Sequence, residues 1–117
     1  MVKSTPTDVL STGECADLLR ALGDKTRLRI LESLLTHEQC VTDLVSELQK
    51  SQPHVSHHLR ILRHAGLIEG IREGQRICYR VNPQFRRALT ATKAQALDFG
   101  CCQLTFPETI LRSRTSH

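Results

Sequence analysis

A mostly α-helical fold with a single β-hairpin is what this sequence predicts. Apolar residues recur at helical spacing through four successive segments before residue 65, and alternating apolar and polar residues with a glycine turn follow them. A length of 117 residues suits one small domain. The hydrophobic fraction of 39% permits a core, but only 3% of the residues are aromatic, so we expect a thin core that dimerisation would strengthen.

The first half of the chain predicts three helices. The first is expected over residues 10–22 and the second over residues 25–36, with Asp24 as the N-cap of the second. Residues 36–39 are polar and are expected to form a connector. Apolar residues at the spacing i, i+3, i+4, i+7 predict a short third helix over residues 41–48.

A fourth helix is predicted in the segment SQPHVSHHLRILRH, with Ser51 as its N-cap and Gly66 just past its end. One face is apolar, and the other carries hydrogen-bond donors without a carboxylate. Arg and Gln side chains read base edges in a major groove, and Ser and His contact bases or phosphates. The candidate DNA-contacting residues are Ser51, Gln52, His54, Ser56, His57 and Arg60. The alternative is an ordinary amphipathic surface helix.

A β-hairpin is predicted directly after this helix, with strands over residues 67–71 and 77–81 and a turn at Gly74. Arg72 and Arg76 flank the tip and are candidates for contacts with phosphates or the minor groove. The alternative is that they are solvated charges that keep an edge strand from aggregating. Two helices joined by a short turn and followed by a basic hairpin are the plan of a winged helix-turn-helix.

A fifth helix is predicted from residue 82 to residue 100, because Pro83 suits a helix start and an apolar stripe follows. The stripe consists of Phe85, Leu89, Ala96 and Leu97. We expect this helix and the first one to form the interface of a homodimer, although the stripe could also fold back on its own core. The domain is expected to cover residues 9–103, between a flexible N-terminus (1–8) and a C-terminal tail (104–117).

The charge distribution favours a nucleic-acid partner. The formal net charge is +4, but residues 50–87 carry eight cations against two acids, and the rest of the chain is therefore net negative. No apolar run reaches bilayer length and no signal-peptide pattern is present, so we expect a cytoplasmic protein without a membrane partner. A small enzyme is the disfavoured alternative, because no Ser-His-acid order, Gly-rich phosphate loop or HExxH motif occurs.

Four segments in this order and spacing resemble the ArsR/SmtB family, which are winged-helix repressors of bacteria that commonly respond to metals. The segments are ALGDKTRLRILESL, CVTDLVSEL, SQPHVSHHLRILRHAGLI and REGQRICYRVNP, within residues 15–83. The resemblance implies a homodimer that binds a pseudo-palindromic double-stranded DNA operator. It places the family's helix contacts on Gln52, Ser56 and His57, and DNA binding itself is expected to need no cofactor.

The resemblance also implies release from DNA by a ligand, and this chain departs from most of the family's ligand sites. A Cys-x-Cys site at the start of the third helix would keep Cys40 but has Thr42 in place of its second cysteine. A site of Asp and His on the last helix would keep only Asp98. A pair of cysteines in the fourth helix is replaced by Ile61 and Ala65.

The remaining candidate is the adjacent pair Cys101 and Cys102, since some family members bind an inducer through paired cysteines at the end of the last helix. Thiolates select As(III), Sb(III), Cd, Pb, Zn or Cu(I). A third thiolate is expected from Cys15, with Cys40 as the alternative, and Cys78 is assigned no role. Five cysteines are an odd number, so no disulfide scaffold is expected. Two other interpretations stay open: the pair is apolar filler, or it is a peroxide-sensing redox pair.

Overall fold

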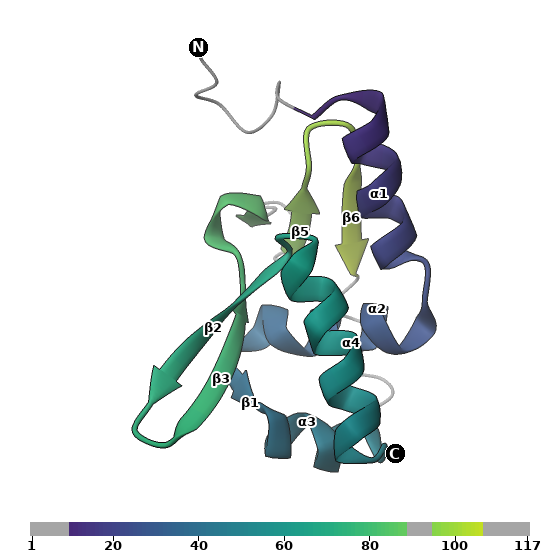
Figure 1. Ribbon diagram of the computed structural model, residues 1–117. Coiled ribbons are helices and arrows are strands. Elements are labelled where there is room, and N and C mark those ends of the chain that lie inside the picture. Colours follow the sequence, from purple (N-terminus) through teal and green to yellow (C-terminus); the bar gives the residue numbers. More distant parts are fainter. Residues whose placement is uncertain (1–9, 89–94, 107–117) are drawn as a thin grey trace. The chain divides into compact units, whose positions relative to one another are not determined.

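The computed structural model describes residues 10–88 and 95–106, which belong to two compact units. One unit spans Thr12–Asn82, and the other contains the described residues from Pro83 onward. Figure 1 shows four helices and a long hairpin in the first unit and short strands in the second. Among the described residues, no helix has both the length and the apolar character that a bilayer span requires.

Four helices form as the sequence predicts. They are α1 (Thr12–Leu22), α2 (Lys25–Thr36), α3 (Val41–Leu48) and α4 (Gln52–His64). Side-chain caps fix two of their starts: the Asp24 carboxylate accepts a hydrogen bond from the Arg27 N–H at 3.1 Å, and Ser51 Oγ accepts one from the His54 N–H at 3.3 Å. Gln49, with a φ of 58°, makes the left-handed turn between α3 and α4.

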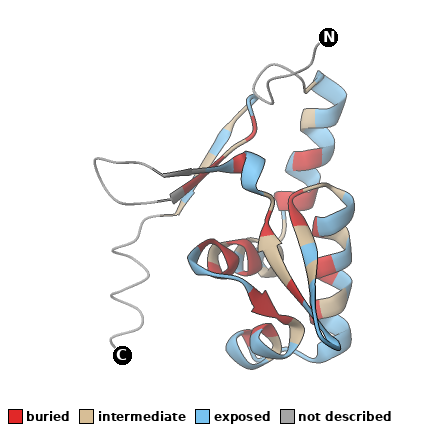
Figure 2. Ribbon diagram, turned by 90° about the vertical axis from the view of Figure 1, so that its left-hand side faces the viewer, coloured by how far each residue is buried: buried red, intermediate tan, exposed pale blue. Residues whose placement is uncertain are grey.

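The core of the Thr12–Asn82 unit lies between α2, α3, α4 and the base of the hairpin. Its completely or almost completely buried side chains are Ile30, Leu31, Leu34, Leu44, Val55, Leu59, Leu62, Leu67 and Val81. Each comes from the apolar face that helical or strand spacing predicts. Figure 2 shows these buried stretches on the inner sides of the helices, with exposed residues on their outer sides.

A three-stranded antiparallel sheet contains the hairpin. Strands β2 (Ile68–Glu73) and β3 (Arg76–Val81) join at Gly74, whose φ of 65° suits glycine, and β1 (Gln39–Cys40) pairs with the other side of β3. The prediction that residues 36–39 form only a polar connector is therefore wrong at residue 39, which begins β1. Gln39 is buried because its amide donates hydrogen bonds to Ser33, to the main-chain oxygen at 3.1 Å and to the hydroxyl.

The unit after Asn82 does not contain the predicted fifth helix among its described residues. It consists of the short 3₁₀ helix η2 (Pro83–Phe85) and the strands β4 (Arg86–Ala88), β5 (Gln95–Asp98) and β6 (Gln103–Phe106). The three strands form an antiparallel sheet in the order β4-β5-β6. Leu89 of the predicted stripe lies outside the described residues, as do the predicted N-terminus (1–8) and residues 107–117.

The turn between β5 and β6 lies where the sequence predicts the end of the fifth helix. Gly100 has a φ of 85°, and its N–H donates to the Asp98 carboxylate at 3.0 Å, which closes the turn between β5 and β6. In β6 half-buried and exposed residues alternate, as in a strand with one covered face. β6 crosses the predicted domain boundary at residue 103. Within this unit, the Phe85 and Phe99 rings pack edge to face, with their centroids 5.2 Å apart.

Candidate functional site

The outer face of α4 presents the residues predicted to contact DNA. Of the six predicted on α4 and its N-cap, Ser56 is half-buried and the other five are exposed. The opposite face is anchored in the core by Val55, Leu59 and Leu62. The structure therefore holds a set of hydrogen-bond donors on a rigid, well-packed helix, as recognition of base edges requires.

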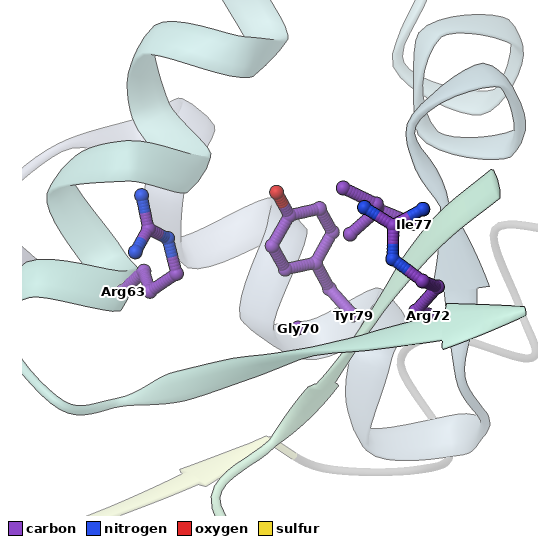
Figure 3. A pocket seen from close by; sticks show the side chains of 5 residues that line it. All are labelled: Arg63, Gly70, Arg72, Ile77 and Tyr79. Atoms are coloured by element: carbon purple, nitrogen blue, oxygen red, sulfur yellow. The ribbon is translucent and has the colours of Figure 1, made fainter. Parts of the chain in front are cut away.

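The hairpin, which we call the wing (residues 68–81), forms a groove with α4. Arg63 of α4 and Gly70, Arg72, Ile77 and Tyr79 of the wing line this groove, whose volume is about 360 Å³. Figure 3 shows the Tyr79 ring between the two arginine side chains. Two cations beside a tyrosine hydroxyl suit a phosphate-bearing ligand.

Arg63 and Tyr79 line this groove but are not among the residues predicted to contact DNA. The hairpin register could have shown Tyr79, because β2 and β3 place Arg72 opposite Ile77 and Gly70 opposite Tyr79. Directly opposed residues share one face of a sheet. The predicted turn at Gly74 fixes that register, so Tyr79 follows Arg72 onto the groove side.

The basic residues of the wing are not equivalent. Arg80 is neutralised within the unit, because its Nε lies 2.6 Å from the Glu69 carboxylate and its Nη1 lies 3.8 Å from Glu38. Arg76 lies 3.9 Å from Asp43 and is partly neutralised. Arg72 makes no ion pair with any described residue, and its charge is therefore available to a partner.

A buried histidine joins the middle of α4 to the turn before α2. His58 Nδ1 lies 3.1 Å from the Arg27 guanidinium and 3.9 Å from the Asp24 carboxylate. Because a guanidinium only donates, Nδ1 accepts and the ring is neutral. Burial lowers the pKa of His58, and Arg27 and the His54 and His57 rings lower it further against the opposing effect of Asp24. His58 therefore packs inside the unit, where it helps to position α4, and is not part of the exposed donor face.

The predicted inducer cysteines lie in the second unit. Cys101 and Cys102 occupy the turn between β5 and β6, and their Sγ atoms are 3.9 Å apart. A zinc-sized ion binds each thiolate at about 2.3 Å, so two sulfurs up to about 4.6 Å apart can share it. Cys15 lies on α1 in the other unit and is half-buried.

Cys40 and Cys78 are paired with each other, although the sequence assigns no role to Cys78 and predicts no disulfide scaffold. They are directly opposite in the register of β1 and β3, and their sulfurs are joined by a disulfide. Both are almost completely buried. The two cysteines are 38 residues apart in the sequence, and only the pairing of β1 with β3 brings them together.

Comparisons with known proteins agree with this architecture. Residues 24–69 match the family model described as "Bacterial regulatory protein, arsR family". Over 76 residues the chain is 40% identical to the HTH-type transcriptional repressor SmtB of Mycobacterium tuberculosis, a match that covers 65% of this chain and 55% of that protein. The matched segment thus spans about half the length of that relative.

Two further similarities concern a repressor and a solved structure. The arsenical resistance operon repressor of Staphylococcus xylosus is 36% identical over 76 residues, covering 65% of this chain and 73% of that protein. The homodimeric winged helix-turn-helix DNA-binding domain Mb0332 of Mycobacterium bovis, a possible ArsR-family regulator, superimposes with a TM-score of 0.58 at 28% identity, covering 64% and 75% of the two chains. The predicted winged helix-turn-helix with a hairpin wing is confirmed.

Proposed function

This chain belongs to the ArsR/SmtB family of DNA-binding transcriptional regulators, which are not enzymes, and from this premise we propose a cytoplasmic repressor that binds its operator as a homodimer. The operator is pseudo-palindromic, with half-sites about one helical turn apart. The observation that carries the proposal is the exposed donor face of α4 beside the basic groove of the wing.

The α4 part and the wing part of this surface are proposed to contact different parts of the DNA. Gln52, Ser56 and His57 are proposed to contact base edges, because a helix in the major groove presents such side chains to the bases. Ser51, His54 and Arg60 flank them, and Arg72 and Arg76 are proposed to contact phosphates or the minor groove. One small domain contacts few bases, and a dimer that contacts two half-sites binds more tightly and more specifically. The Mycobacterium bovis relative, which is described as homodimeric, supports this stoichiometry.

A thiophilic inducer bound by Cys101 and Cys102 is the proposed signal that releases the DNA. Cys101 is disulfide-bonded in the structure, so the pair binds an ion only after reduction, and the 3.9 Å separation of the two sulfurs then allows one ion to contact both thiolates. Cys15 is the preferred third ligand, and Cys40, the alternative, is bonded to Cys78 and would have to be reduced first. The relative from Staphylococcus xylosus is named an arsenical resistance repressor, and this name favours As(III), with Sb(III), Cd, Pb, Zn and Cu(I) as the other candidates.

The decisive experiment measures operator binding by fluorescence anisotropy while light scattering gives the oligomeric state. We expect a dimer that binds its own promoter DNA and is released by one of the thiophilic ions. A monomer that does not bind this DNA would refute the proposed function as a homodimeric repressor. Release by peroxide in metal-free buffer would instead favour the redox alternative.

A double variant, Cys101→Ser with Cys102→Ser, tests the inducer site. Its operator affinity without inducer should match that of the wild type, and release should require far more inducer or fail. Coupling between an effector and DNA is typically about 1–3 kcal/mol, or roughly 5- to 150-fold in affinity. Release at the wild-type inducer concentration would exclude this pair as the inducer site.

A further inference from the structure

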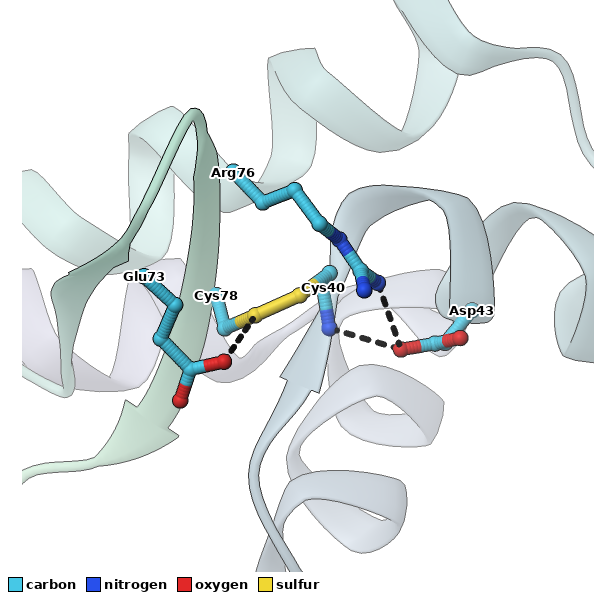
Figure 4. The surroundings of a disulfide bond; sticks show 5 residues. All are labelled: Cys40, Asp43, Glu73, Arg76 and Cys78. Carbon is cyan, nitrogen blue, oxygen red and sulfur yellow. Dashed lines mark hydrogen bonds and ion pairs between the residues drawn. A yellow bond between two sulfur atoms is a disulfide. The ribbon is translucent and has the colours of Figure 1, made fainter.

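The disulfide between Cys40 and Cys78 has a third potential ligand beside it. Glu73, on the neighbouring strand β2, places its carboxylate Oε1 3.7 Å from Cys78 Sγ. The two sulfurs and a carboxylate oxygen all lie within 4.8 Å of one another. Figure 4 shows the Glu73 carboxylate directed at the sulfur pair from the wing side.

These distances suit a metal ion once the sulfurs are reduced. Zinc binds a thiolate at about 2.3 Å and a carboxylate oxygen at about 2.1 Å, so these two donors of one ion can lie up to about 4.4 Å apart. The separation of 3.7 Å between Cys78 Sγ and Glu73 Oε1 is within this limit. No large rearrangement of β2 is needed to bring the third donor to the ion.

Burial and charge also favour an ion over a pair of free thiols. Cys40 and Cys78 are 5% and 4% exposed, as is usual for structural metal ligands, whereas Glu73 is exposed and provides a route from solvent. Two thiolates and a carboxylate would carry three negative charges beside a divalent ion. The Arg76 guanidinium, which reaches past Cys40 toward Asp43 in Figure 4, supplies positive charge next to the site.

We propose that Cys40, Cys78 and Glu73 form a site for a thiophilic divalent cation such as zinc or cadmium. Two electrons and two protons from a thiol reductant first convert the disulfide to two thiols. The ion then displaces both thiol protons and binds the two thiolates. The reduced state rests on the proposed function, because a cytoplasmic DNA-binding protein works where thiols are kept reduced.

The site joins the two parts of the DNA-binding surface. Cys40 is the N-cap of α3, the first helix of the helix-turn-helix, and Cys78 and Glu73 belong to the wing. An ion bound by all three residues would fix the wing relative to α3. It would stabilise the folded unit, because a ligand that binds only the folded state raises the free energy of unfolding.

The test uses the full chain with Cys15→Ser, Cys101→Ser and Cys102→Ser, which keeps only Cys40 and Cys78 of the five cysteines. This protein is reduced with a phosphine and titrated with Cd²⁺ without oxygen. We expect one Cd²⁺ per chain, a thiolate-to-cadmium charge-transfer band, release of two protons and a higher melting temperature. The oxidised protein should show none of these changes.

Glu73→Gln in the same background separates a three-donor site from a simple dithiol. Its cadmium affinity should fall roughly tenfold or more, since even second-shell changes cost that much. Glu69→Gln, on the same strand but paired with Arg80, is the matched control and should leave the affinity unchanged. Glu73 is exposed, so its variant remains informative if substitution of a buried cysteine prevents folding.

The proposal would be overturned by a disulfide that the phosphine does not reduce, by a reduced protein that binds no Cd²⁺, or by an unchanged cadmium affinity in Glu73→Gln. Unchanged affinity when Cys78→Ser is added would count equally against it. None of these measurements uses DNA. A protein that binds Cd²⁺ here but not its operator would therefore refute the proposed function and leave this site standing.

Discussion

Arg27 donates a hydrogen bond to His58 at 3.1 Å and thereby ties α4 to α2. The same guanidinium donates to the Ala21 carbonyl at 2.6 Å through its Nε, so one side chain connects the end of α1 with the middle of α4. Because the arginine stays charged at every working pH, the histidine must accept and remain neutral for the bond to persist.

Stability is predicted to fall as the pH drops below about 6.5, the ordinary pKa of histidine. The pKa of His58 is lowered in the folded protein, so the unfolded chain binds the proton first between its ordinary pKa and the lower folded one. The free energy of unfolding therefore rises with pH in that window and is constant above it. Urea unfolding between pH 5 and pH 8 measures this dependence.

His58→Gln should remove this part of the pH dependence, although it lowers stability overall. His64→Gln is the control, because His64 is exposed near the end of α4, and it should keep the wild-type slope. Asp24 opposes the shift of the His58 pKa, so Asp24→Asn should widen the pH window. Identical slopes in His58→Gln and the wild type would show that other groups control the pH response.

Replacing a base-contacting residue is predicted to alter sequence preference at one position. His57→Ala should cost about 1–3 kcal/mol on the preferred operator and much less on operators changed at the base pair that His57 reads. Anisotropy titrations with a set of single-substitution operators measure this difference. His37→Ala, at the exposed end of α2, is the control and should bind every operator like the wild type. Equal losses on all operators would assign His57 to the phosphates instead.

Arg72 and Arg80 are predicted to differ in DNA binding although both lie on the wing. Arg72→Gln should weaken binding to every sequence and reduce the salt slope of log K by about 1, because its free charge releases a counterion. Arg80→Gln should change the slope much less, since its Nε lies 2.6 Å from the Glu69 carboxylate. Titrations at several salt concentrations measure both slopes. Equal slopes for the two variants would contradict the assignment.

The elements that the sequence predicts correctly are those with local signals. Ser51 and Gly66 mark the two ends of α4, and Gly74 fixes the register of the wing. These signals lie within a few residues of the structure that they determine. The exposed donors of α4 follow from the same helical period, and Tyr79 follows from the hairpin register that Gly74 fixes, although Arg63 and Tyr79 are not among the predicted contacts.

The elements that the sequence analysis misses depend on partners distant in the chain. β1 has only two residues and exists because β3 pairs with it, and Gln39 is buried there because Ser33 accepts its amide hydrogens. The Cys40–Cys78 contact follows from the same pairing. The predicted fifth helix fails for a related reason: Gln95–Asp98 pairs as a strand with Gln103–Phe106 across the turn at Gly100, and helical spacing of the apolar residues does not reveal this pairing.

The polar cluster formed by the buried Ser33 and Gln39 with the exposed Glu47 gives the last prediction. Ser33 Oγ donates to the Glu47 carboxylate at 2.7 Å and accepts from the Gln39 amide, so it joins α2, β1 and α3. Ser33→Ala leaves the buried Gln39 amide with fewer partners. The variant should lose about 1–3 kcal/mol of unfolding free energy in urea titrations.

A double-mutant cycle tests whether the loss comes from the unmatched amide or from the hydroxyl alone. Gln39→Leu with Ser33→Ala removes both partners, and its total cost should be clearly less than the sum of the single costs. Ser46→Ala, on the exposed face of α3, should stay within about 0.5 kcal/mol of the wild type. Strictly additive losses would mean that the cluster contributes no coupling, and β1 would then owe its position to its pairing with β3 alone.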